Sequence, residues 1–203
     1  MNSIALEGFM IPGLHFKNCC IWVLHWTRTP RSLPSKMTEV WILWNNGRKT
    51  CYVNSIDAIP FFKIYHDFDE VICADIHINL STTRFDICVN SKNDTQELLR
   101  LESAPRNSLK YQLLNFLIKH TNKDSEKGRT ETGKSYENIP KKIHSLSIHS
   151  AILNGNSLTL IHNSKMTYDI GDGKPSKKPI INYCTHQLEK ERACPDSFRA
   201  RSF

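Results

Sequence analysis

The stretch EVWILWNNGRKTCYV, residues 39–53, decides the fold expected for this chain. Asn46 and Gly47 separate two runs that are rich in Val, Ile, Trp and Tyr. Asn and Gly accept the positive φ angles of a two-residue type I′ turn, and β-prone runs on both sides of such a turn predict a β-hairpin. Centring the turn on this pair places Trp41 opposite Tyr52.

Both faces of the predicted hairpin are apolar. One face has Val40, Ile42, Cys51 and Val53, and the other has Trp41, Leu43 and Tyr52. A sheet with one face in water would alternate apolar and polar side chains. Either the rest of the domain covers both faces, or one face is left for a partner. Because aromatic anchors dominate protein interfaces, Trp41, Trp44 and Tyr52 are the predicted interaction surface.

Further elements follow from local patterns. Alternation predicts strands over 70–80 and 82–89, and a second Asn-Gly pair at 154–155 predicts a hairpin over 143–163. Capping residues predict a helix over 94–103. A helix over 107–120 rests on apolar residues at helical spacing, which are Leu109, Leu113, Phe116 and Leu117. The expected fold class is α+β, a small sheet built on the two hairpins and packed with the two helices.

Composition divides the chain into five segments around a net charge of +7. An apolar N-terminal segment with a basic Pro/Ser linker (1–36) precedes an α+β core (37–120) that is mildly acidic. A polar basic linker (121–142), a β-hairpin segment (143–170) and a basic tail (171–203) follow. The linker and the tail are expected to be disordered.

GRTETGKS, residues 128–135, matches the phosphate-binding loop pattern at Gly128, Gly133, Lys134 and Ser135. Such a loop would bind ATP or GTP with magnesium. It needs a buried strand before it and a helix after it. The charged run before Gly128 predicts no strand, and Pro140 leaves room for about one helical turn. We therefore interpret the stretch as the middle of the basic linker.

Two further sites have weaker patterns. His15, Cys19, Cys20 and His25 are ligand types that zinc prefers, but their spacing is not the paired spacing of a zinc finger. Buried free thiols are the alternative. Thr29 and Ser32 lie among Arg and Pro residues, where a phosphate could meet neighbouring Arg side chains. An unmodified linker is the alternative there.

The function expected from the sequence is non-catalytic binding inside the cell. The basic tails or the apolar hairpin surface would contact a protein or a nucleic acid. Seven cysteines and the absence of a recognisable secretory signal favour a reducing compartment, cytoplasmic or nuclear, with a mitochondrial address left open. No membrane span, no resident cofactor and no small-molecule substrate are predicted. The alternatives are a nucleotide-binding protein using GRTETGKS, and a poorly folded product of a reading frame not under selection.

Overall fold

The computed structural model describes residues 3–92, 96–121, 125–161 and 175–190. Eleven strands form a single sheet in this part of the chain. The strands are β1 (Ser3–His15), β2 (Cys19–Arg28), β3 (Met37–Trp44), β4 (Lys49–Val53), β5 (Glu70–Leu80), β6 (Phe85–Ser91), β7 (Glu97–Arg106), β8 (Glu126–Arg129), β9 (Ser135–Leu153), β10 (Asn156–Ser157) and β11 (Ile180–Glu189). The helices are the 3₁₀ turn η1 (Ile56–Ala58), α1 (Ile59–Tyr65) and α2 (Leu109–Thr121).

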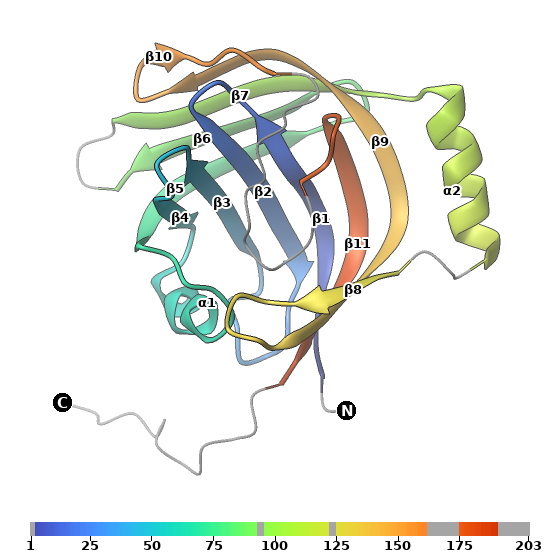
Figure 1. The fold of residues 1–203 in the computed structure, drawn as a ribbon, viewed down its shortest axis with the longest axis horizontal. Coiled ribbons are helices and arrows are strands. Elements are labelled where there is room, and N and C mark those ends of the chain that lie inside the picture. Colours follow the sequence, from blue (N-terminus) through green and yellow to red (C-terminus); the bar gives the residue numbers. More distant parts are fainter. Residues whose placement is uncertain (1–2, 93–95, 122–124, 162–174, 191–203) are drawn as a thin grey trace.

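The sheet closes on itself through β9. Along the sheet the strand order is β9-β11-β1-β2-β3-β4-β5-β6-β7. The first half of β9 pairs with β11, and its second half pairs with β7, so the last strand meets the first (Figure 1). Only the β4–β5 pair among these is parallel, and η1 and α1 make the crossover that such a pair requires.

This closed sheet corrects the predicted α+β fold. The predicted helix over 94–103 is wrong, because β7 occupies Glu97–Arg106 and its Leu99 and Leu101 point to the inside of the closed sheet. The helix predicted over 107–120 is present as α2. The apolar side chains of residues 97–103 fit the spacing of a helix and the alternation of a strand. The segment forms a strand because it pairs with β6 and β9.

The predicted disordered linker and tail are also wrong where the structure describes them. Residues 121–142 contain β8 and the beginning of β9. The tail predicted over 171–203 supplies β11, which lies between β9 and β1 in the middle of the sheet. Strands from the segments on both sides of 37–120 thus lie in the same sheet. Residues 162–174 and 191–203 lie outside the described residues.

The hairpin over 39–53 is present, but its register differs from the predicted one by one residue. Val40 lies opposite Tyr52, and Trp41 lies opposite Cys51. The loop has three residues, because Trp44 N–H donates to Arg48 O (2.8 Å) and Gly47, at φ 87°, follows a tight turn. A shift of one residue moves a side chain to the other face of a sheet. Trp41 and Tyr52 therefore lie on opposite faces and do not form a pair.

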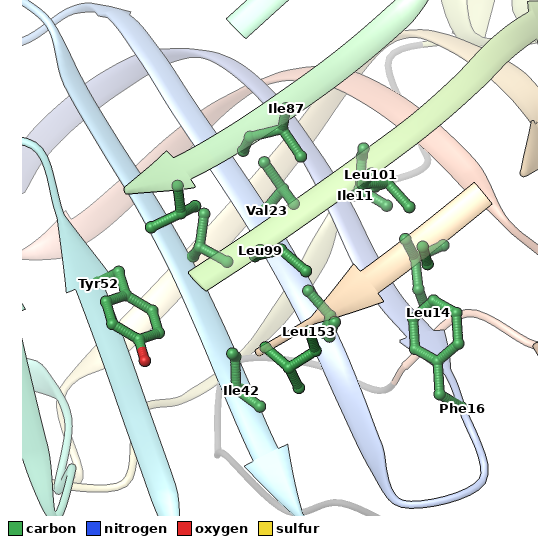
Figure 2. Packing of buried hydrophobic residues seen from close by; sticks show 14 of the residues in the cluster. Ile11, Leu14, Phe16, Val23, Ile42, Tyr52, Ile87, Leu99, Leu101 and Leu153 are labelled. Atoms are coloured by element: carbon green, nitrogen blue, oxygen red, sulfur yellow. The ribbon is translucent and has the colours of Figure 1, made fainter. Parts of the chain in front are cut away.

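The two faces of the hairpin belong to two cores. The inner core lies inside the closed sheet, where side chains from all its walls meet (Figure 2). Its labelled members are Ile11, Leu14, Phe16, Val23, Ile42, Tyr52, Ile87, Leu99, Leu101 and Leu153. The outer core lies between the other face of β1–β4 and α1, and includes Trp22, Trp26, Trp41, Phe62 and Tyr65. Both faces of the hairpin are thus covered by the rest of the chain, which is one of the two alternatives that the sequence left open.

A carboxyl group lies in the outer core between two tryptophans. Glu39 is 2% exposed. Trp26 Nε1 donates to its Oε1 (2.7 Å), and Trp41 Nε1 donates to its Oε2 (2.9 Å). Each oxygen thus satisfies an indole donor that would otherwise be buried without an acceptor, which fixes β2 against β3 on this face.

We expect Glu39→Gln to lower the free energy of unfolding by about 1–3 kcal/mol, measured by urea titration. The amide has one oxygen for two indole donors, so its NH₂ group faces an N–H. Glu126→Gln on exposed β8 is the matched control and should change the free energy by less than about 0.5 kcal/mol. A Glu39→Gln variant as stable as this control would show that the two indole hydrogen bonds do not hold the outer core.

Candidate functional site

A cleft of about 660 Å³ opens at one end of the closed sheet. We call it the mouth cleft. We call its apolar lining residues the floor and its polar and charged lining residues the lip. The floor residues are Phe9, Ile76, Ile78, Leu80 and Tyr183, and the lip residues are Glu7, His25, Thr38, Lys36 and Lys141.

A gap in the wall of the sheet makes this cleft. β4 pairs with β5 only from Thr50–Glu70 to Val53–Cys73. Within the described residues no strand pairs with the same side of β5 beyond Cys73. Ile76 and Ile78 continue the inward-facing row of β5, pack against the inner core and line the cleft. The inner core is thus reached from solvent at this end.

A β-bulge shapes the opposite wall. Glu7 pairs with Arg28, whereas Gly8 pairs with Trp26, which leaves an extra residue in β2. A Cβ at Gly8 would lie 1.9 Å from the carbonyl oxygen of His25, so only glycine allows this approach. Beyond the bulge, Phe9 lies opposite His25, so a floor residue and a lip residue are neighbours across β1 and β2.

His25 is the histidine of the cleft. Its Nδ1 lies 2.8 Å from Thr38 Oγ1, and its ring lies 5.2 Å from that of Phe9. Burial, and secondarily the charge of Lys36, lower the pKa of His25 from its ordinary value. The imidazole is therefore neutral at pH 7 and contributes a hydrogen-bonding group without charge.

Cations outnumber acids at the lip. Lys141 Nζ lies 3.2 Å from Glu7 Oε2, and Arg28 Nη1 lies 3.7 Å from the same oxygen. Pro140 of β9 lies opposite Cys184 of β11, and Lys142 lies opposite Tyr183. Lys141 is therefore the extra residue of a β-bulge in β9. One carboxylate thus faces two cations, and Lys36 adds a third charge. The electrostatic preference of the lip is for an anion.

A second cavity of about 600 Å³ adjoins the first and shares Leu80 and Tyr183 with it. His144 lines this side. Its Nδ1 lies 2.5 Å from Asn107 Oδ1, and its ring meets that of Tyr183 edge-on at 6.1 Å. Burial raises the pKa of Tyr183, and burial and Lys142 lower the pKa of His144. Both groups are neutral at pH 7, and Lys142, which also lines this cavity, supplies its positive charge.

The four residues of the predicted zinc site do not form one cluster, although His15 lies opposite Cys20 in the β1–β2 pair. Cys19 belongs to the inner core and Cys20 to the outer core, because neighbours in a strand point to opposite faces. His25 lines the mouth cleft instead. No group of three or more potential ligands that could hold a metal ion occurs among the described residues. Burial raises the pKa of Cys19 to about 12, so this thiol is protonated at pH 7.

GRTETGKS forms a hairpin loop between β8 and β9. Thr130 N–H donates to Lys134 O and Gly133 N–H donates to Thr130 O (both 2.8 Å), with Gly133 at φ 84°. This repeats the loop geometry of residues 44–48. Gly128 lies in β8, and Ser135 begins β9, so a strand follows where a phosphate-binding loop has a helix.

The GRTETGKS loop fastens the β8–β9 hairpin to the rest of the chain. Glu131 accepts a hydrogen bond from Lys49 Nζ (2.6 Å), and Thr132 Oγ1 donates to Ile64 O (2.7 Å) at the end of α1. Glu131 also accepts from Asp67 N–H (3.1 Å), and Ser135 N–H donates to Glu189 Oε2 of β11 (3.0 Å). Nucleotide binding there stays an untested prediction to which this geometry adds nothing.

The other predicted residues lie away from the cleft. Trp41 and Tyr52 are buried, and Trp44 is half-buried with Nε1 3.4 Å from Thr50 Oγ1. Thr29 Oγ1 donates to Pro34 O (2.6 Å), and Ser32 is exposed. Modification at either residue stays a prediction.

Sequence reasoning found one cleft residue, His25, and gave it another role. The cleft draws on β1, β2, β3, β5, β9 and β11, which are far apart in sequence. A cleft residue can be recognised in the sequence as a polar residue at the end of a strand that is in phase with the inward-facing apolar residues. Thr38, which precedes the inward-facing Val40 and Ile42, is an example. To use this pattern, one must know which residues of each strand point inward, and the sequence alone does not show this.

No protein-family model and no curated protein sequence matches this chain. Two solved acetoacetate decarboxylase structures resemble it distantly. The one from Legionella pneumophila has a TM-score of 0.49 and 6% identity, over 93% of this chain and 84% of that one. The other has a TM-score of 0.45 and 9% identity, over 93% and 87%. No helix among the described residues is long and apolar enough to cross a membrane.

We expect the stability of the protein to fall as the pH is lowered from about 6.5, the ordinary pKa of histidine. The folded pKa of His25 and His144 is lowered, so the unfolded chain binds protons that the folded chain does not, and stability rises with pH in this window. Urea titrations between pH 7.5 and 5.5 measure the slope.

His25→Gln, which keeps a group able to bond Thr38, should reduce proton uptake on unfolding by up to about one proton. Equal slopes for wild type and His25→Gln would contradict the assigned burial of His25.

Proposed function

We propose that the protein binds a small molecule with an apolar body and a carboxylate group in the mouth cleft. The observation that carries this proposal is an apolar floor beneath a lip with more cations than acids. The cleft volume is within the range of small-molecule sites, which are mostly apolar with a few placed polar groups.

The residues divide the ligand into two parts. Ile76, Ile78 and Leu80 offer contact to a hydrocarbon chain, and its transfer from water supplies most of the affinity. Lys141 can turn from Glu7 to a ligand carboxylate, and His25 can donate or accept one hydrogen bond through Nε2. The lysine thus selects for the acid, and the floor selects for the chain.

A protein or nucleic-acid partner, expected from the sequence, stays a prediction. The hairpin aromatics that were to contact it are buried, except for half-buried Trp44. The charge that was to attract it remains, at +7 for the chain. Lys36 and Lys141 of the mouth cleft carry part of this positive charge, and a small anionic ligand would give that part a role.

We expect decanoate to bind more tightly than 1-decanol in isothermal titration calorimetry at pH 7.5. Lys141→Met should weaken decanoate binding about tenfold and leave decanol unchanged, since a charged hydrogen bond is lost only with the acid. Leu80→Asn should weaken both ligands, because it removes apolar contact at a half-exposed position.

Lys127→Met on β8, outside the cleft, is the matched control and should bind both ligands as wild type does. Thermal unfolding of each variant verifies that it is folded. Equal affinity for decanoate and decanol would refute the role of the lip. Failure of both ligands to bind at millimolar concentration would refute the proposed function.

A further inference from the structure

Helix α2 carries a row of large apolar side chains on its outer face. The exposed fractions are 83% for Leu109, 63% for Leu113, 59% for Phe116 and 43% for Leu117. At 3.6 residues per turn these four residues form one continuous row along the helix, which we call the apolar stripe. Exposed apolar patches of this kind mark interaction sites.

The opposite face of α2 is already engaged. Asn115 donates from Nδ2 to Ile143 O (2.9 Å) and accepts from Ile143 N–H (2.7 Å), so its amide pairs with β9 as a strand would. Ile118, one turn further along this face of α2, is buried. Figure 1 shows α2 on the outside of the closed sheet beside β9. The stripe therefore cannot turn inward without breaking these contacts.

Positive charge flanks the stripe on both sides. Lys110 lies about 100° from Leu109 around the helix axis and Lys119 about 80° on the other side. The helix contains no acidic residue. A helix with lysines beside a Leu/Phe face is typical of helices that lie in a membrane interface.

A cavity of about 490 Å³ beside the first turn of α2 adds further charge. Lys110, Lys177 and Lys178 line it, together with the hydroxyl-bearing residues Ser108 and Ser145. We call it the lysine pocket. No carboxylate forms an ion pair with these three lysines within the described part of the chain. The Ser145 hydroxyl already donates to Arg106 O (2.9 Å), so the three ammonium groups are the donors that suit the oxygens of a phosphate group.

We propose that the apolar stripe and the lysine pocket together dock the protein on an anionic phospholipid bilayer. A phospholipid supplies both chemistries side by side, with acyl chains for Leu113 and Phe116 and a phosphate headgroup for the lysine pocket. An acidic protein would form ion pairs with these lysines at the surface. It would have no need to place a group inside the lysine pocket.

Vesicle co-sedimentation of the full chain tests this docking. We expect binding to vesicles of phosphatidylcholine with 30% phosphatidylglycerol, at least tenfold weaker binding to phosphatidylcholine alone, and weakening with added salt. The double variant Leu113→Ser/Phe116→Ser should lose at least tenfold in affinity for the anionic vesicles. The triple variant Lys110→Gln/Lys177→Gln/Lys178→Gln should lose a similar factor.

Matched controls remove the same chemistry elsewhere. Ile56→Ser changes an apolar residue that is 67% exposed outside α2, and Lys17→Gln/Lys63→Gln/Lys127→Gln removes three exposed charges. The Ile56 variant should bind as wild type does, and the control lysine variant should lose less than threefold. All the changed stripe residues are exposed, and circular dichroism verifies that each variant keeps its fold.

Three outcomes would overturn the proposal. The first is no binding to anionic vesicles at low salt. The second is polyglutamate binding as tight as vesicle binding and unchanged in Leu113→Ser/Phe116→Ser, which would assign the surface to acidic polypeptides. The third is a dimer in size-exclusion chromatography that this double variant dissolves, which would assign the stripe to a second copy.

Discussion

The double pairing of β9 is the constraint on which the rest of the structure depends. Its first half pairs with β11 and its second half with β7, so this one strand closes the sheet between β11 and β7. Without this closure the inner core would face water along two open edges. The same strand holds the β8 hairpin and, through Ile143, anchors α2. Both cavities at the mouth also include residues of β9.

A wall buried on both faces follows from this closure. β1, β2 and β3 have the inner core on one side and the outer core on the other, so His25 and Trp26 are neighbours in sequence with opposite surroundings. The sequence of residues 39–53 indicated such a wall, because both faces were apolar. It did not settle the register, since Asn46-Gly47 suits a two-residue loop and a three-residue loop alike. That one residue decides which side Tyr52 faces.

The rest of the fold lay beyond local patterns for a physical reason. α2 was predicted because its spacing is helical, and β5 because it alternates, and both signals are contained within the element. β7 and β11 are strands because of partners far away in sequence, and β11 lies in a segment that is polar and basic as a whole. The mouth cleft depends on how six strands pair and on the bulge at Gly8, so it could not be assembled before the pairings were known.

Neighbouring positions of β9 connect the two proposals. Lys141 reaches the mouth cleft, Lys142 and His144 line the cavity beside it, and Ser145 lines the lysine pocket under α2. Asn107 lies on the cleft side of this row, and Ser108 lies on the lysine-pocket side. A protein docked through α2 would therefore hold its cleft close to the bilayer surface. An apolar carboxylic acid partitions into such a surface, so docking would shorten the path of this ligand through water.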